Sequence, residues 1–307
     1  MRAITYAQFG DASVLHLSDV PEPNPGPDEV IVEVRAVGLN PVDFKARQGH
    51  LSGLIETVFP VVPAWDVAGV VTRLGADTPE FKIGDEVFAY ARKDVLHAGT
   101  LAEKVAVPVR AAALKPASLS FEEAAAVPLA GLTALRTVRR AQVHAGDRVL
   151  IHNGSGGVGS FAIQLAIAAG ATVTATASER NHDYVRSLGA TPITYGDGVA
   201  ERALEVQPEG YDVVLDYIGK EAVEASAPLL RSGSRLVTIA AGKSAIERGG
   251  SVVWVRPDSA ALEELAGLID EGKVHVEVAR TYPLEEAADA YRELETGHVR
   301  GKVVVVL

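Results

Sequence analysis

The stretch that decides the fold is Arg148-Val-Leu-Ile-His-Asn-Gly-Ser-Gly-Gly-Val-Gly-Ser160. A short apolar run breaks into closely spaced glycines that lead directly into a second apolar run. Gly154, Gly156 and Gly159 have the G-x-G-x-x-G spacing, in which the glycines permit a tight turn, close approach of a pyrophosphate, and packing of helix on strand. Because the context is right on both sides, the motif predicts a dinucleotide phosphate site rather than a purely structural turn.

A helix starting near Gly157 would direct its first N–H groups and its positive dipole end at the phosphates. We therefore expect cofactor contacts from Gly154, Ser155, Gly156, Gly157, Val158 and Gly159.

Outward from this turn, strand-like runs alternate with helical patterns from about residue 147, which is typical of a parallel sheet covered by helices. This order predicts an α/β, doubly wound sheet with its ligand crevice at the carboxyl ends of the strands. The predicted strands are Val149–His152, Thr172–Thr176, Pro192–Tyr195, Asp212–Asp216, Arg235–Ile239 and Val252–Val255, and helices begin near Gly157, Arg180, Gly198, Lys220 and Ser259.

The first 115 or so residues are β-rich, with short runs punctuated by Pro and Gly. Ser120 and Glu123 form a capping-box signal for a helix that follows a linker-like segment. The predicted strands here are Val30–Val37, Val67–Leu74 and Glu86–Ala89; beyond Val255 we expect a helix at Ala260–Glu271, a strand at His275–Ala279, a helix at Leu284–Thr296 and a strand at Lys302–Val306.

Composition narrows the function classes. The chain has 307 residues, enough for about two domains, and 29 basic against 40 acidic side chains give a net charge of -11, which disfavours nucleic acid as a partner. No apolar run is long enough to span a bilayer and the start resembles a strand, so we expect no membrane association and a cytoplasmic location. The absence of cysteine excludes disulfides, thiol nucleophiles and cysteine-ligated zinc.

The chain resembles the medium-chain dehydrogenase/reductase superfamily, and within it the zinc-independent quinone oxidoreductase-like (zeta-crystallin-like) branch. The matching stretches are Val37–Lys45, Val62–Val71, Phe81–Val87, Val127–Ala134, the glycine turn, Tyr282–Ala288 and Gly297–Lys302. The resemblance implies a GroES-like catalytic domain over residues 1–116, completed by residues 258–307, and a Rossmann NAD(P)-binding domain over residues 117–257.

The resemblance also bears on metal binding. Where zinc-dependent relatives place a ligand cysteine, this chain has Asn40, and where they place a Gly-His-Glu motif it has Ala64-Trp65-Asp66. We therefore predict no metal. Without a Lewis acid, alcohol oxidation is disfavoured, and hydride addition to a quinone or an activated C=C bond is the expected chemistry.

The end of the second Rossmann strand selects the cofactor, because an acidic residue there binds the ribose 2′-OH and repels a 2′-phosphate. Ser178 and Arg180 can hold a phosphate, and Tyr195 lies where the resembling family has a phosphate-binding tyrosine. Asn181 stands where that family often has lysine, and Glu179 adds a negative charge. NADPH is favoured over NADH, with capping of the next helix as the alternative role for this segment.

By resemblance, Asn40, Asp43 and Lys45 lie near the nicotinamide. Asn40 can hydrogen-bond a substrate carbonyl, position the cofactor amide or form an Asx turn before Pro41, and Asp43 can orient Lys45 or cap a helix. Lys45 can donate a proton to the developing enolate, or it is a solvated surface lysine and water is the donor. Trp65 is expected to wall a substrate pocket or pack in the core.

Three further positions complete the expected cofactor site. Thr133 resembles a residue near the nicotinamide phosphate, with helix packing as its alternative role. Ala240 and Gly242 follow the fifth strand and would approach the nicotinamide through their backbone. His152, inside a strand, is expected to be structural.

These observations predict an oxidoreductase: an NADPH-dependent quinone or enone/enal reductase. The alternatives are an NADPH-binding structural or regulatory protein without turnover, and an enoyl-thioester reductase. The apolar run near Val252–Val255 would be an exposed edge strand, which predicts a homodimer through this edge.

Overall fold

The computed structural model describes residues 1–307. The chain divides into two compact units: unit 1 comprises Met1–Leu132, Arg256–Gly272 and Val276–Leu307, and unit 2 comprises Thr133–Val255 and Lys273–His275. Unit 1 thus runs to Leu132, beyond the boundary expected at residue 116, because helix α2 (Phe121–Ala125) packs against strands of unit 1.

Unit 2 contains a six-stranded sheet in the order β12-β11-β10-β13-β14-β15, and every pair in it is parallel. Numbered within the unit, this is the order 3-2-1-4-5-6 of a doubly wound nucleotide-binding fold, which confirms the predicted fold class. The strands are β10 (Arg148–Ile151), β11 (Thr172–Ala177), β12 (Thr191–Thr194), β13 (Tyr211–Asp216), β14 (Leu230–Thr238) and β15 (Ser251–Val252).

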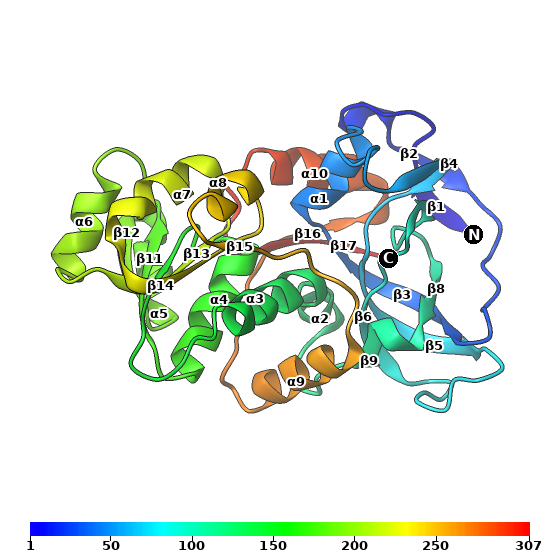
Figure 1. Cartoon of the computed structure of the whole chain (residues 1–307). Coiled ribbons are helices and arrows are strands. Elements are labelled where there is room, and N and C mark those ends of the chain that lie inside the picture. The colour runs from blue at the N-terminus through cyan, green and yellow to red at the C-terminus, as the bar shows by residue number, and fades with distance from the viewer. The chain divides into compact units, whose positions relative to one another are not determined.

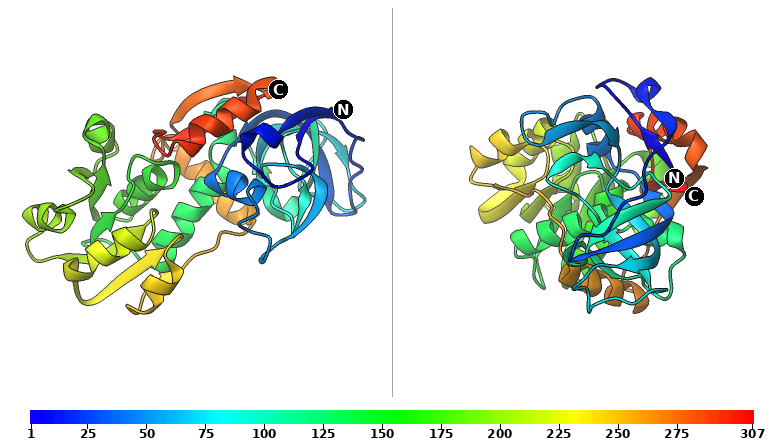
Figure 2. Two further views of the ribbon diagram at one scale, coloured as in Figure 1. Left: turned by 90° about the horizontal axis from the view of Figure 1, so that it is seen from above. Right: turned by 90° about the vertical axis from the view of Figure 1, so that its right-hand side faces the viewer.

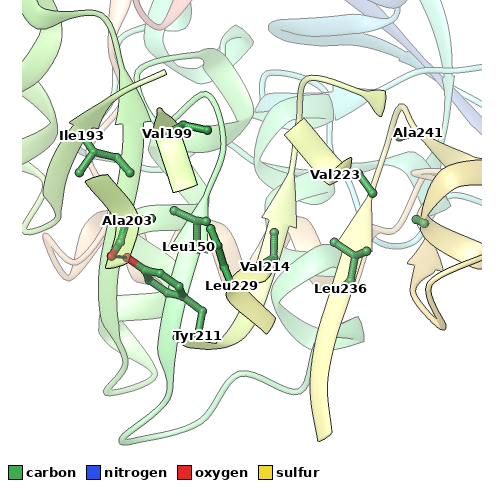
Figure 3. Close-up of a cluster of buried hydrophobic side chains, with 11 residues drawn as sticks. Leu150, Ile193, Val199, Ala203, Tyr211, Val214, Val223, Leu229, Leu236 and Ala241 are labelled. Atoms are coloured by element: carbon green, nitrogen blue, oxygen red, sulfur yellow. Dashed lines mark hydrogen bonds between the residues drawn. The ribbon is translucent and has the colours of Figure 1, made fainter. Parts of the chain in front are cut away.

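Helices connect these strands, as parallel strands require. They are α4 (Gly157–Ala168), α5 (His182–Ser187), α6 (Val199–Val206), α7 (Lys220–Ser226) and α8 (Gly242–Ile246), and the C-terminal part of α3 (Pro128–Arg140) precedes β10 in the same unit. Figure 3 shows part of the resulting core, where Leu150, Val214 and Leu236 from three strands pack with Val199 and Val223 from two helices.

Unit 1 is built around the sheet β16-β17-β3-β5-β6-β9, with β8 also paired to β3 (Figure 1). Both chain ends belong to this unit and lie near each other in the views of Figure 2. Its strands are β1 (Arg2–Thr5), β2 (His16–Asp19), β3 (Glu29–Gly38), β4 (Glu56–Val62), β5 (Asp66–Leu74), β6 (Glu86–Tyr90), β7 (Val95–Ala98), β8 (Lys104–Pro108), β9 (Ala112–Leu114), β16 (Val278–Pro283) and β17 (Lys302–Val306), and its helices are α1 (Pro41–Arg47), α2, the start of α3, α9 (Ser259–Asp270) and α10 (Ala287–Glu295).

Two predicted strands were misplaced. The strand expected at His275–Ala279 begins at Val278, because the backbone of His275 pairs with the side chain of Gln164 at 2.7 and 3.0 Å instead of with a strand. The strand expected at Val252–Val255 ends at Val252, because its partner β14 ends at Thr238 and leaves no further ladder.

Candidate functional site

The predicted glycine turn joins β10 to α4 and is tied to the neighbouring strand β11. Asn153 has a left-handed backbone (φ 63°), and its N–H donates to the Thr176 hydroxyl at 3.0 Å. The N–H of Gly154 donates to the Thr176 carbonyl at 2.8 Å. The turn is therefore held by backbone bonds on its β11 side.

Two of the glycines are required by close packing. A Cβ on Gly159 would lie 2.0 Å from the Asn153 carbonyl oxygen, and a Cβ on Gly154 would lie 2.6 Å from the Ala175 Cβ. A Cβ on Gly156 would meet the Asn153 side chain instead, at 2.6 Å. Close packing therefore excludes side chains at the first and third glycines, whereas the proximity of Gly156 to a pyrophosphate stays a prediction.

The start of α4 fits a phosphate group. Gly156 is the extended residue before the helix, and no side chain caps it. The N–H groups of the first helical residues Gly157, Val158 and Gly159 have no partner inside the helix, so they can bind an anion. The donor set therefore fits the pyrophosphate of a dinucleotide.

The residues expected at a 2′-phosphate gather at the carboxyl ends of β11 and β12. Ala177 pairs with Thr194, so Ser178 and Tyr195 leave the sheet side by side. Tyr195 and Arg180 are exposed. Asn181 differs from the rest, because its buried amide donates to the Ser155 hydroxyl at 3.1 Å and so ties this segment to the glycine turn.

Strands β13 and β14 are joined at the same edge by Asp216, a residue without a predicted role. Its buried carboxylate accepts from the Thr238 hydroxyl at 2.6 Å and from the N–H groups of Ile218 and Gly219. The Thr238 oxygen in turn accepts from the N–H of Ala240 at 3.0 Å. The N–H of Ala240 is thus already hydrogen-bonded inside the protein. Gly242 is the first residue of α8.

Two other predicted residues of unit 2 are buried. The hydroxyl of Thr133 has no hydrogen-bond partner, and a bound phosphate oxygen would satisfy such a group. His152 Nε2 and the Ser226 hydroxyl are 2.7 Å apart, and burial lowers the pKa of His152 to about 4. His152 is therefore neutral in the folded protein and structural, as predicted.

In unit 1 the side chain of Asn40 lies in a buried polar cluster. Its Nδ2 donates to Asp66 Oδ2 at 2.8 Å and to the Gly38 carbonyl at 3.3 Å, and its Oδ1 accepts from the Lys302 ammonium. Lys302 also donates to the Leu39 carbonyl at 2.6 Å. The Asn40 amide is thus hydrogen-bonded inside the protein through both its nitrogen and its oxygen.

Asp43 and Lys45 lie on the same helix in different surroundings. Asp43 is buried, and its carboxyl accepts from the Asn40 N–H at 2.7 Å. It therefore caps α1, which is one of the two roles predicted for it. Lys45 is exposed to solvent. The geometry favours the surface-lysine interpretation of Lys45.

Trp65 is 5% exposed and packs edge-on against Tyr90, with ring centroids 6.2 Å apart. It also lines a small pocket of unit 1 together with Tyr6, Asp43 and His97. Core packing and a pocket wall, the two roles expected for Trp65, therefore coexist.

Burial dominates the electrostatics of this cluster. Desolvation raises the pKa of Asp66 to about 6, opposed by the Lys302 ammonium and by hydrogen bonds from Asn40 and from the Leu129 N–H. Desolvation raises the pKa of Asp43 to about 8. The same effect lowers the pKa of Lys302, which the two carboxyls oppose.

Asp66 and Lys302 were assigned no role from the sequence. Each carried a signal, because Asp66 begins a strand of buried apolar residues and Lys302 precedes four valines. Opposite charges at the starts of two buried strands predict an internal pair, but they do not tell which residue is the partner. The structure contains no group of three or more His, Cys, Asp or Glu side chains that could hold a metal ion.

Comparison with known proteins agrees with the fold. Residues 26–117 match the family described as alcohol dehydrogenase GroES-like domain, and residues 188–305 match that described as zinc-binding dehydrogenase. An NADPH-dependent alkenal/one oxidoreductase from Arabidopsis thaliana is 38% identical over 99% of this chain and 79% of its own length.

Solved structures are similar over the full chain. A quinone oxidoreductase from Coxiella burnetii has 35% identity and a TM-score of 0.89, covering 100% of this chain and 99% of its own. A mycobacterial protein complexed with NADPH has 27% identity and a TM-score of 0.87, covering 100% of both chains. The fold is that of a GroES-like domain joined to a Rossmann domain. The chain belongs to the quinone oxidoreductase-like branch of the medium-chain dehydrogenase/reductase superfamily.

Proposed function

We propose that the protein is an NADPH-dependent, zinc-independent reductase that transfers hydride to quinones or to α,β-unsaturated carbonyl compounds, enones and enals. The observation that carries the proposal is the glycine turn of unit 2, which places the free N–H groups of α4 at the carboxyl edge of a doubly wound sheet. The alkenal/one and quinone oxidoreductase names of its relatives support the substrate class.

The chain's own residues supply the binding chemistry for the cofactor, which when bound supplies the hydride. Gly157, Val158 and Gly159 would hold the pyrophosphate through their N–H groups. Ser178 and Arg180, with Tyr195 beside them, would hold the 2′-phosphate. β11 ends at Ala177 rather than at an acidic residue, which favours NADPH, whereas the charge of Glu179 opposes it. The NADPH named in the relatives supports this choice over NADH.

Zinc independence is proposed from the donor set in unit 1. The Asn40 oxygen is taken by Lys302, and both Asp66 oxygens accept N–H groups from Asn40 and Leu129. Trp65 offers no metal-binding atom. These side chains are satisfied by one another, so a carbonyl oxygen of the substrate would be stabilised by hydrogen bonding rather than by a Lewis acid.

The test is NADPH oxidation by chelator-treated protein with quinones, enones, enals and enoyl thioesters, alongside simple alcohols with NADP⁺. Turnover of quinones or enones without stoichiometric zinc is expected. NADPH binding without turnover would instead support a structural or regulatory protein, and exclusive use of thioesters an enoyl-thioester reductase. Zinc-dependent alcohol oxidation would overturn the assignment.

We also propose a homodimer through β15. Val252 and Trp254 are 43% and 48% exposed, and Ile246 in the adjacent α8 is 64% exposed. An apolar edge of this kind is protected when it pairs with another chain. Light scattering at micromolar concentration tests the dimer, and a monomer would refute it.

No helix is long and apolar enough to cross a membrane. The cytoplasmic location stays a prediction, which cell fractionation would test.

A further inference from the structure

The chain leaves the sheet of unit 2 where β12 ends. β12 is the outermost strand, so it has a strand neighbour only on the side of β11. Its last paired residue is Thr194, which lies opposite Ala177. Tyr195 is therefore the first residue beyond the sheet, and it is 58% exposed. The ladder of the sheet does not fix its position, so another group must do so if Tyr195 is to contact a ligand in one place.

Arg202 supplies a support of this kind from α6, which packs beside β12 (Figure 1). Its guanidinium donates hydrogen bonds to four consecutive backbone carbonyl oxygens. The distances are 2.9 Å from Nε to Thr194, and 3.3, 3.5 and 2.9 Å from Nη2 to Tyr195, Gly196 and Asp197. The two contacts at 2.9 Å are the strong ones, and they lie at the two ends of the segment. We call residues 194–197 the clamped loop.

The sequence of the loop fits the guanidinium. Gly196 and Gly198 have left-handed backbones, with φ of 87° and 75°, so the chain turns sharply on either side of Asp197. A Cβ on Gly198 would lie 3.0 Å from Arg202 Nη1, so a glycine here also leaves room for the guanidinium. The backbone adds one turn bond, from the Val199 N–H to the Gly196 carbonyl at 3.0 Å. Most hydrogen bonds that shape the loop therefore come from Arg202.

The kind of acceptor decides what Arg202 can do. The acceptors are backbone carbonyls rather than a carboxylate, so the side chain holds the loop instead of forming a surface ion pair. A guanidinium presents five donors in a fixed fork and can serve several acceptors at once, whereas a lysine ammonium is a compact charge on a flexible stem. Replacing arginine by lysine should therefore release part of the loop while keeping the charge.

We propose that Arg202 is a positioning residue for the cofactor. By holding the carbonyls of the clamped loop, it keeps the Tyr195 side chain beside Ser178, where the 2′-phosphate of NADPH would bind. The inference rests on the proposed function, in which Ser178 and Tyr195 recognise that phosphate. Arg202 acts through Tyr195 rather than through its own contact with the cofactor, and in this way it strengthens the preference for NADPH over NADH.

The hold on the loop is measured first, without any cofactor. Amide hydrogen exchange of the full chain reports on the Val199 N–H, which donates across the loop to Gly196. Arg202→Lys should raise the exchange rate of this amide about tenfold, the value of one lost hydrogen bond. Arg186→Lys is the control, because Arg186 lies on the neighbouring α5 and pairs with exposed Asp183. Equal exchange rates in the parent and in Arg202→Lys overturn the proposal.

The effect on the cofactor is measured by binding, so it does not require turnover. Isothermal titration with NADPH and with NADH gives the ratio of the two affinities for each variant. Arg202→Lys should lower this ratio about tenfold, because NADPH binding weakens while NADH binding stays nearly unchanged. Arg186→Lys should keep the ratio of the parent. A purely structural role would weaken both cofactors alike or neither, so an unchanged ratio in Arg202→Lys overturns the proposal.

A double-mutant cycle asks whether Arg202 acts through Tyr195. When Tyr195→Ala is already present, Arg202→Lys should change the affinity ratio no further, because the side chain that it positions is gone. Independent, additive losses would show that Arg202 contacts the 2′-phosphate directly, and they would overturn the positioning role.

Failure of this inference and failure of the proposed function give different results. A parent that binds NADPH tightly but reduces no quinone or enone lacks the proposed activity, while the affinity ratios still decide the role of Arg202. A parent that binds NADPH no more tightly than NADH has no preference for Arg202 to strengthen, and this result overturns the inference together with the proposed cofactor.

Discussion

The glycine turn of unit 2 and the polar cluster of unit 1 are built by opposite means. The turn is a continuous segment in which a carbonyl oxygen and a neighbouring Cβ exclude side chains at Gly159 and Gly154. The cluster joins Asn40 to Lys302, 262 positions later in the chain, through side-chain contacts. A turn built by local backbone geometry has a fixed residue spacing that can be recognised in the sequence. A buried pair of residues far apart in the chain has no such spacing, so it cannot be recognised in this way.

The largest effect is expected in the cluster. Lys302→Met would leave the Asp66 carboxylate without its ammonium, and removing one partner of a buried pair typically costs about 3–5 kcal/mol in unfolding free energy. Urea unfolding followed by Trp65 fluorescence, in a Trp254→Phe background, would report on unit 1. Lys104→Met is the control, because its pair with Glu22 is largely exposed. Equal losses of unfolding free energy in Lys302→Met and Lys104→Met would show that the buried pair is no more important than the exposed one.

The turn should be nearly as sensitive at its third glycine. Gly159→Ala places a Cβ 2.0 Å from the Asn153 carbonyl oxygen, which cannot move without displacing the turn. We expect a loss of about 3 kcal/mol, near the upper end of typical overpacking costs, and weaker NADPH binding. Hydrogen exchange of the β10 amides measures the loss. Gly267→Ala, which meets no atom within 4 Å in α9, should instead stabilise by up to about 1 kcal/mol.

A smaller effect is expected where the turn meets the ends of β11 and β12. Arg180→Ala should weaken NADPH binding by about 1.5–3 kcal/mol, the value of a charge-assisted hydrogen bond, and leave NADH binding nearly unchanged. Fluorescence titration with both cofactors measures the difference. Equal losses would show that Arg180 does not recognise the 2′-phosphate.

The effect that is smallest near neutral pH concerns a buried group that bears no charge. The pKa of His152 is about 4 in the folded protein, below the usual 6.5, because burial disfavours the imidazolium. The unfolded chain therefore binds the proton first, so the contribution of His152 to stability falls as the pH drops from 6.5 towards 4, by up to about 1.4 kcal/mol per pH unit. Asp43 and Asp66, whose pKa values are raised, act in the opposite direction, so the quantity to measure is the difference in unfolding free energy between parent and His152→Leu in urea. A difference that is constant over this pH range would refute the assignment.

Much of the fold follows from patterns within short segments. The strand predicted at Lys302–Val306 has those bounds, and the Ser120–Glu123 capping box begins α2 as expected. The errors arose where side chains from elsewhere bind the backbone, as Gln164 does at His275. At the candidate site, the alternatives left open for Asn40 and Lys45 depended on burial. Burial is set by β17 and β5, which lie far from the Asn40–Lys45 segment in sequence.

The pairing of β17 with β3 has a consequence for synthesis on the ribosome. Val304 lies opposite Gly38, so the strand that pairs with β3 on this side comes from a segment more than 260 residues later in the chain. Unit 2 is nearly continuous and has all six of its strands once residue 252 has emerged. The nucleotide-binding half can therefore form first, while the earlier-made β-rich half waits with an open place beside β3. Until Lys302 arrives, the Asp66 carboxylate has no cation to pair with, and the polar interior of this half stays incomplete.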